Sequence, residues 1–261
     1  MASQPTLFTK EDKCYKPVLP PKPVYHGIGK LECVTVCINY ADFLEVTLQH
    51  NLHHFDEFVV VTSHEDKSTQ SVCAKHGVIC VATDAMTERG DEVNKGHGIN
   101  IGLAYLRQTD WVLHLDADII LPDRFRTMLD KSRLDESCIY GADRVNVVGR
   151  DAYEKMITTN EFKRQFHHKY LVNTPANLPL GARLLHNEYG YCPMGFFQLW
   201  NAKENKRYPY NQGGAEHTDI LFSLQWPVQK RLLLPNVICY HIESEPAKMG
   251  ANWNGRTTKK F

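Results

Sequence analysis

Two carboxylates separated by one small residue, Asp116 and Asp118, stand directly after an apolar segment, WVLHL, and directly before another, IIL. Two acids at the end of an apolar strand repel each other unless water, hydrogen bonds or a cation compensate for their burial. Carboxylate oxygens are ligands that Mg2+ and Mn2+ prefer. In an arbitrary sequence such a pair more often caps a turn or a helix, so its interpretation depends on the neighbouring segments.

The segment KGHGINIGLAYLRQTDWVLHLDADIILP, residues 95–122, resembles the donor-binding block of GT-A glycosyltransferases, in which a glycine-containing helix is followed by a strand and a D-x-D motif. The resemblance covers most of the domain, and Asn100 and Gly102 match family positions. It implies that Asp118 binds a divalent metal directly. It implies that Asp116 binds the metal directly or through water, or holds the ribose, and that the nucleotide sugar lies over the helix.

The reaction implied by this resemblance explains the need for a cation. Breaking the bond between a sugar C1 and a phosphate releases a nucleoside diphosphate with developing negative charge, which a divalent ion stabilises without any proton transfer. GT-A enzymes commonly supply a further metal ligand from a histidine near the C-terminus, and His241 in VICYHIES matches this pattern. A histidine that is only hydrogen-bonded at a strand end is the alternative.

Further residues are candidates for holding the donor, and each also has an ordinary structural interpretation. Asn39 and Tyr40 end the first expected strand, where the family meets base and ribose, and Tyr40 either stacks on a base or packs in the core. Thr83 and Asp84 end the third expected strand and either bind uracil or ribose or form a surface turn. The candidates for binding the diphosphate are Lys95 and, in a polar tail that otherwise is simply solvated, Lys248, Asn252, Asn254 and Arg256.

The segment QGGAEHTD, residues 212–219, resembles the G-G-x-E-D-x-D segment of inverting glycosyltransferases, in which the acid after the glutamate is usually the general base. This sequence has His217 at that position. The base needed beside the acceptor hydroxyl is therefore expected at Glu216 first, then at Asp219 or His217. A helix N-terminus with favourably placed acids is a compatible interpretation. Upstream, Gly195 is expected to allow a sugar to approach closely.

The elements that position these residues alternate along the chain. LECVTVCINY, EFVVVTS and GVICV predict buried strands, separated by helices around residues 44–55 and 66–75. With residues 95–122, this pattern predicts an α/β fold with a Rossmann-like, mostly parallel twisted sheet flanked by helices, as in GT-A enzymes. Ligands bind such sheets at the carboxyl ends of the strands.

The second half of the chain is expected to form the acceptor side. Polar helices are predicted near residues 124–133 and 152–170, followed by loops. GFFQLWN and NVICYH predict strands, with a helix near residues 217–224 between them.

The domain boundaries follow from proline content. Five of the thirteen prolines fall in the first 23 residues, which predicts that residues 1–30 form an extended arm without ladder pairing. A single GT-A domain is expected over residues 31–261, with a nucleotide-sugar-binding half over 31–122 and an acceptor-side half and tail over 123–261.

Composition and charge are those of a globular protein. The 261 residues are 43% hydrophobic, and 30 Lys plus Arg offset 30 Asp plus Glu, so no overall field gathers nucleic acid or anionic membrane. No apolar run suits a membrane span or a signal peptide, so we expect a cytoplasmic protein, a virus-encoded enzyme in a host cytoplasm included. The eight cysteines, without any CxxC, are expected to be buried free thiols.

Together these observations predict an enzyme, a glycosyltransferase that uses Mn2+ or Mg2+ and moves a sugar from a nucleoside diphosphate, with UDP favoured, to a hydroxyl with inversion. The acceptor is open between a glycan, a protein and a hydroxymethylated DNA base, and the sequence does not predict an oligomeric state. A sugar-1-phosphate nucleotidyltransferase is a competing class, although its Gly-rich phosphate loop is missing. A third class is a non-catalytic nucleotide- or carbohydrate-binding module; the departure at His217 argues mildly for it, whereas the presence of Asp116, Asp118 and His241 argues against it.

Overall fold

The computed structural model describes residues 13–15, 27–87, 93–159, 186–187, 190–210, 217–245 and 260–261. Its strands are β1 (Lys13–Tyr15), β2 (Leu31–Val36), β3 (Glu57–Thr62), β4 (Ile79–Ala82), β5 (Trp111–Leu115), β6 (Ile119–Ile120), β7 (Ile139–Val148), β8 (His186–Asn187), β9 (Gly190–Tyr191), β10 (Phe197–Asn201) and β11 (Arg231–Glu243). Its helices are α1 (Ala41–Asn51), α2 (Lys67–His76), α3 (Lys95–Leu103), α4 (Phe125–Lys131), α5 (Arg150–Thr158) and α7 (Thr218–Ser223), with short 3-10 helices η1 (Leu52–His54), η4 (Ala202–Glu204) and η5 (Val228–Lys230).

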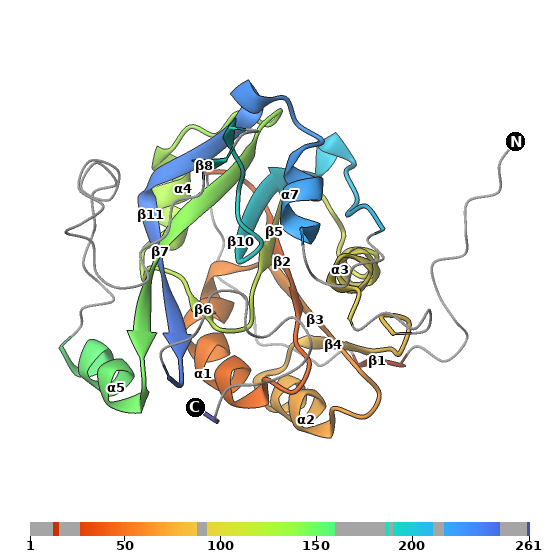
Figure 1. Ribbon diagram of the computed structural model, residues 1–261, viewed down its shortest axis with the longest axis vertical. Helices are drawn as coiled ribbons and strands as arrows, with labels where there is room; N and C mark the ends of the chain where they lie inside the picture. Colours follow the sequence, from red (N-terminus) through yellow and green to blue (C-terminus); the bar gives the residue numbers. More distant parts are fainter. Residues whose placement is uncertain are drawn as a thin grey trace, which may run out of the picture.

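One twisted sheet runs through the molecule, with the strand order β1-β4-β3-β2-β5-β10-β7-β11-β6 (Figure 1). The neighbouring pairs β4-β3, β3-β2 and β2-β5 are parallel. Beyond β5 the sheet is mixed, because β10 is antiparallel to both β5 and β7, whereas β7 and β11 are parallel. The predicted α/β fold with a parallel, helix-flanked sheet over the first half is confirmed.

Two apolar cores lie on the two faces of this sheet. Alternate residues of β2 face opposite sides: Cys33 packs in the core that includes residues of α1, α2 and α4, and Val34 packs in the core that includes residues of α3 and α7. This alternation follows from the two-residue period of a strand. Both faces of the central strands are therefore buried, as their nearly continuous apolar sequence predicts.

Side chains cap the two helices that precede β4 and β5. The Asp66 carboxylate accepts a hydrogen bond from the Thr69 amide at the start of α2 (3.0 Å). The Asn94 side chain accepts one from the His97 amide at the start of α3 (3.0 Å). Each bond satisfies an amide that has no partner within its helix.

Two glycines bring α3 close to the sheet. A Cβ at Gly102 would lie 2.8 Å from Val61 Cγ2 and closer still to Val34, and a Cβ at Gly98 would lie 2.5 Å from the Met86 sulfur. Only glycine allows this separation, because real Cβ atoms do not approach other atoms so closely. The glycines of residues 95–103 therefore set how near the start of α3 lies to the carboxyl ends of β2 and β3.

The expectation that residues 1–30 make no ladder pairing is wrong. β1 pairs antiparallel with β4, with Lys13 opposite Ala82 and Tyr15 opposite Cys80. The three residues lie between Pro5 and Pro17, so their own amides are available for a ladder.

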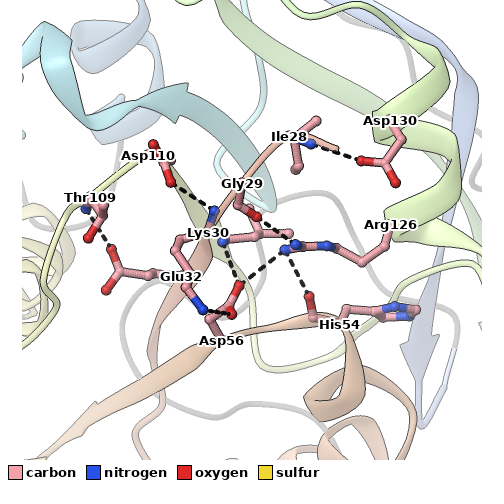
Figure 2. A network of polar contacts seen from close by, with 11 residues as sticks. Ile28, Gly29, Lys30, Glu32, His54, Asp56, Thr109, Asp110, Arg126 and Asp130 are labelled. Carbon is pink, nitrogen blue, oxygen red and sulfur yellow. Dashed lines mark hydrogen bonds and ion pairs between the residues drawn. The ribbon is translucent and has the colours of Figure 1, made fainter. Parts of the chain in front are cut away.

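A hydrogen-bonded network ties the segment before β2 to the domain (Figure 2). The Ile28 amide donates to Asp130 (3.0 Å), and the Lys30 amide donates to Asp110 (2.9 Å). The buried Arg126 guanidinium donates to the Gly29 carbonyl (2.7 Å). This network closes the amino-terminal side of β2, at the end of the strand opposite to the candidate site.

Strand β7 was not predicted. Its sequence, IYGADRVNVV, lies in a stretch that was expected to hold helices and loops. Asp143, Arg144 and Asn146 interrupt the apolar run and conceal the strand. The predicted helix near residues 124–133 corresponds to α4. The one near 152–170 corresponds in part to α5, which ends at Thr158, and residues 160–170 lie outside the described residues.

Two expectations from composition concern cysteines and membranes. All seven cysteines in the described part of the chain are buried and free, which confirms the prediction for them. Cys14 belongs to β1, whose side chains lie outside the description. In the described ranges no helix combines the length and apolar character needed to cross a bilayer.

Candidate functional site

Parallel strands bring several of the predicted residues to one edge of the sheet. β4, β3, β2 and β5 all run in the same direction, so their carboxyl ends meet there. Asn39 follows β2, Thr83 and Asp84 follow β4, and Asp116 follows β5 directly. This edge is where ligands bind in open α/β sheets.

Asp118 and His241 are brought together by the pairing of β6 with β11. Ile119 lies opposite His241 in this ladder, and the Ile242 amide donates to the Asp118 carbonyl (2.9 Å). As a result, His241 Nε2 lies 3.1 Å from Asp118 Oδ2. The other ring nitrogen, Nδ1, lies 2.9 Å from Glu243 Oε1. A histidine held by a carboxylate on Nδ1 presents Nε2 in a fixed direction, which is the arrangement that metal-binding histidines commonly have.

The second carboxylate oxygen of Asp118 carries the strongest sign of a missing ligand. Asp118 Oδ1 is buried and accepts no hydrogen bond from the residues that the structure describes. A buried anionic oxygen without a partner is costly. The oxygen and nitrogen atoms of Asp118 and His241 fit Mg2+ or Mn2+, because these ions are often bound by one or two protein side chains together with phosphate oxygens and water.

The described residues do not form a complete metal cage. Within these ranges, no three His, Cys, Asp or Glu side chains are gathered so that they could hold an ion by themselves. Asp116, the third predicted ligand, is instead paired with Lys95. Asp118 and His241 are therefore the two described side chains that could hold an ion together.

Charge shifts both members of the Asp118–His241 pair toward their ionised forms. Burial opposes ionisation of each, but the attraction of His241 outweighs it and holds the pKa of Asp118 below its usual value. In the same way Asp118 and Glu243 outweigh burial and raise the pKa of His241. Asp116 differs, because burial together with repulsion from Asp118 raises its pKa although Lys95 opposes the shift. A cation at this site therefore has to displace the proton on His241 Nε2.

Lys95 and Asp116 form an ion pair at the mouth of the site. Lys95 Nζ lies 2.5 Å from Asp116 Oδ1, and both side chains remain partly exposed, at 22% and 28%. Lys95 is the first residue of α3, so the helix cap at Asn94 sets its position. Lys95 therefore lies beside the predicted metal site. This position agrees with the expectation from the sequence that Lys95 contacts the diphosphate.

The remaining donor candidates at the sheet edge have structural partners of their own. The Asn39 amide donates to Asp66 (2.7 Å), and Asn39 has a left-handed backbone (φ 60°). Tyr40 stacks on Phe43 with a centroid separation of 5.2 Å. The buried Thr83 accepts a hydrogen bond from the Ala85 amide (3.2 Å). Their neighbour Asp84 is exposed and accepts one from the His64 amide (3.2 Å).

Asn100 holds a loop of the second half in place. Its amide group donates to the Tyr208 carbonyl (2.8 Å), and its carbonyl accepts from the Tyr208 amide (2.9 Å). These paired bonds use one donor and one acceptor of the side chain and hold Tyr208 against α3. The assignment of Asn100 to the donor stays a prediction from the sequence.

The predicted base segment is described only from His217 onward. His217 is exposed, has a left-handed backbone (φ 60°) and precedes α7. Asp219 accepts hydrogen bonds from the Gly195 amide (2.8 Å) and from the Ile220 amide (2.9 Å), one on each carboxylate oxygen. A Cβ at Gly195 would lie 2.9 Å from Asp219 Cβ. The expectation that Gly195 admits a sugar is therefore corrected, because the Asp219 side chain occupies that space.

We expect that Asp219→Asn weakens the fold by about 1–3 kcal/mol, because it replaces a charge-assisted hydrogen bond to a backbone amide. Urea unfolding measures the change. Asp123→Asn is the matched control, since Asp123 is exposed in the described structure. An Asp219→Asn protein with unchanged stability would show that the two hydrogen bonds accepted by Asp219 do not stabilise the fold. Asp219 would then be a stronger candidate for the general base.

Five of the predicted residues lie outside the described residues: Glu216, Lys248, Asn252, Asn254 and Arg256. Their assignments stay predictions from the sequence.

Arg144 is a site residue that the sequence analysis missed. It lies on β7, two residues before Asn146, which contacts His241 Nδ1 (3.2 Å). Its guanidinium lies 4.7 Å from the centroid of the Phe196 ring, and its charge helps to lower the pKa of Asp118. No sequence motif marks Arg144, because its position depends on the unpredicted strand β7.

Comparisons with known proteins give similarity only at the level of structure. No family model matches the sequence, and the search of curated proteins gives no match. Among solved structures, mannosyl-3-phosphoglycerate synthase from Rubrobacter xylanophilus is 14% identical with a TM-score of 0.49, over 84% of this chain and 68% of that one. Glucosyl-3-phosphoglycerate synthase from Mycobacterium tuberculosis, in complex with Mn2+, UDP and glucosyl-3-phosphoglycerate, is 11% identical with a TM-score of 0.47, over 84% and 72%.

Proposed function

We propose that this chain is a metal-dependent glycosyltransferase of the GT-A type, which transfers a sugar from a nucleoside diphosphate, UDP, to a hydroxyl group. One observation carries the proposal. A buried carboxylate oxygen without a hydrogen-bond partner, Asp118 Oδ1, lies beside a histidine whose other nitrogen is held by Glu243, at the edge of the sheet where ligands bind. One oxygen and one nitrogen ligand from the protein suit an ion whose other ligands are diphosphate oxygens and water.

Each described residue of the site has a task in this proposal. Asp118 and His241 would hold Mn2+ or Mg2+, which as a Lewis acid stabilises the charge that develops on the diphosphate leaving group. Lys95, the first residue of α3, supplies a second positive charge beside the proposed metal site. Asp116 keeps Lys95 in place and is close enough to Asp118 for the charge of Asp118 to help raise the pKa of Asp116. These groups stabilise the leaving group by charge rather than by giving it a proton.

The donor base and ribose are assigned to the sheet edge formed by Asn39, Tyr40, Thr83 and Asp84. Main-chain and side-chain polar groups gather there around β2 and β4, and Tyr40 offers an aromatic face. We assign the tail residues Lys248, Asn252 and Arg256 to the diphosphate from the sequence resemblance.

The transfer is proposed to proceed with inversion, which requires a base beside the acceptor hydroxyl. Both carboxylate oxygens of Asp219 accept backbone amides, which makes Asp219 the weaker candidate. Glu216 is therefore proposed as the base, with His217 as the alternative in the same turn.

A thermal-shift screen with the full chain tests the proposed function. UDP and UDP-sugars should raise the melting temperature only when Mn2+ is present, because a ligand that binds the folded state stabilises it by mass action. At a hundredfold excess over Kd, the expected gain is about 2.7 kcal/mol, or a shift of about 5–11 °C for a chain of this size. If no nucleotide shifts the melting temperature with Mn2+, the proposal is wrong.

The products then separate the three classes that compete at the level of sequence. A glycosyltransferase releases UDP from a UDP-sugar, a nucleotidyltransferase forms pyrophosphate from UTP and a sugar phosphate, and a binding module forms neither. The acceptor is assigned by adding glycan, protein and hydroxymethylated DNA in separate reactions and measuring which one accelerates UDP release.

A further inference from the structure

A chain of buried polar side chains lies between β10 and the proposed site, and it reaches Asp116. Its members are Gln198, Tyr208 and His114, with exposed fractions of 0%, 3% and 1%. Gln198 and His114 are directly opposite each other on the paired strands β10 and β5. Tyr208 Oη contacts both, at 2.5 Å from Gln198 Oε1 and 3.1 Å from His114 Nδ1.

The available donors and acceptors determine which group donates at each contact of this hydrogen-bonded chain, beginning at Gln198. Its Nε2 donates to two carbonyl oxygens, those of Pro193 and Asp219, each at 3.0 Å. Carbonyl oxygens only accept, so the orientation of the Gln198 amide is determined and its Oε1 faces Tyr208. Oε1 needs a donor, and the single hydroxyl proton of Tyr208 is therefore directed to Gln198.

The tautomer of His114 follows. Since the Tyr208 proton is used by Gln198, the Tyr208 oxygen accepts at its contact with His114, and Nδ1 must carry the ring proton. In the neutral ring, Nε2 then has a lone pair. It is buried, has no hydrogen-bond partner and lies 3.6 Å from Asp116 Oδ1, which also carries the contact to Lys95.

We propose that His114 is a positioning residue for the cationic side of the donor site: Gln198 and Tyr208 hold its ring as the Nδ1–H tautomer, so that Nε2 lies beside Asp116 Oδ1, the oxygen that pairs with Lys95. Two acceptors that face each other repel unless a positive group lies with them. Lys95 is that group in this structure. The inference rests on the proposed function, because Lys95 is there assigned to the diphosphate.

The hydrogen-bonded side chains of Gln198, Tyr208 and His114 also connect the two halves of the molecule. Gln198 binds the carbonyl of Asp219 at the start of α7, in the segment expected to supply the base, while His114 lies two residues before Asp116. Support of this kind, one step removed from the ligand, commonly changes affinity by about 10–100-fold when it is removed. His114 and Gln198 lie in segments that the sequence analysis named, but it gave neither residue, nor Tyr208, a role of its own.

The first test is spectroscopic and involves no ligand. Long-range proton–nitrogen correlation spectra of the full chain, labelled with 15N-histidine, distinguish the two ring nitrogens. His114→Gln identifies the signals by their loss. A protonated Nδ1 and a bare Nε2 are expected, and Tyr208→Phe should shift the population toward the Nε2–H form. An Nε2–H tautomer or an imidazolium in the unmodified chain would overturn the proposal.

The second test measures UDP affinity with Mn2+ by calorimetry. His114→Leu should weaken it about tenfold, and His114→Gln should recover most of the loss, since the glutamine oxygen takes the place of the Nε2 acceptor. Unchanged affinity in a folded His114→Leu protein overturns the inference. A wild-type chain that binds no UDP with Mn2+ contradicts the proposed function itself, and that result involves no variant, so the two failures are distinguishable.

Discussion

Asp118→Ala is expected to abolish metal-dependent nucleotide binding, with at least a hundredfold loss in the affinity for UDP in the presence of Mn2+. A hundredfold loss corresponds to about 2.7 kcal/mol. The reason is geometric. Asp118 Oδ1 is buried and has no hydrogen-bond partner among the described residues, and the other carboxylate oxygen, Oδ2, lies 3.1 Å from His241 Nε2. Calorimetry with UDP and Mn2+ measures the loss.

Two controls make this result specific. Asp123→Ala removes an exposed carboxylate five residues further along the same segment and should leave the affinity unchanged. Removing divalent ions with a chelator should reduce the wild-type affinity to that of Asp118→Ala, because both treatments remove the same interaction. If Asp118→Ala kept the Mn2+-dependent affinity, the metal assignment would be wrong, whatever the outcome for His114.

Arg126→Met is expected to have the largest effect on stability, a loss of about 3 kcal/mol in the free energy of unfolding. Arg126 is 4% exposed, contacts Asp56 Oδ2 at 3.4 Å and donates to the Gly29 carbonyl at 2.7 Å (Figure 2). Removing one member of a buried ion pair typically costs about 3–5 kcal/mol. The lower end applies here, because Asp56 keeps the Lys30 side chain and the Leu31 amide as partners.

The pH dependence of this loss has a definite sign. Burial opposes ionisation of Asp56, but Lys30, the Leu31 amide and Arg126 together hold its pKa below its usual value. A carboxyl with a lowered pKa stabilises the fold above its unfolded pKa, about 3.9, and loses this contribution as the pH falls through the folded value. The difference between Arg126→Met and wild type should therefore shrink below about pH 4.

Lys30→Met is the matched control, because Lys30 contacts the same carboxylate, Asp56, from an exposed position (62% exposed). Exposed ion pairs contribute about 0–1 kcal/mol, so this variant should remain close to wild type in chemical unfolding. Equal losses for the two variants would show that burial of Arg126 does not determine the energy of the network.

The sequence by itself predicted the features that depend on neighbours along the chain. The β-α-β-α-β order follows from apolar periodicity, and the caps at Asp66 and Asn94 act within three residues. The alignment of Asn39, Thr83 and Asp116 at one sheet edge follows from the parallel order of their strands. Local spacing was sufficient for these features because helices and strands impose a fixed period on their side chains.

Only the tertiary structure decided the contacts that give the site its chemistry. His241 was singled out from a family resemblance, but its contact with Asp118 spans 123 residues and depends on the pairing of β6 with β11. Strand β7 escaped prediction because Asp143, Arg144 and Asn146 interrupt its apolar pattern. Of these three residues, Asn146 contacts Glu243 and His241 on the neighbouring strand β11.

The clearest division between the two sources of information lies at His114. As a letter in WVLHL it is one more residue of a buried strand, and nothing in its neighbourhood distinguishes it. Its tautomer depends on Tyr208, 94 residues away, and on Gln198, which is 10 residues from Tyr208 and opposite His114 in the sheet. Strand periodicity determined which face of the sheet each side chain occupies, whereas the folding of distant segments onto that face determined which proton donor or acceptor each side chain meets.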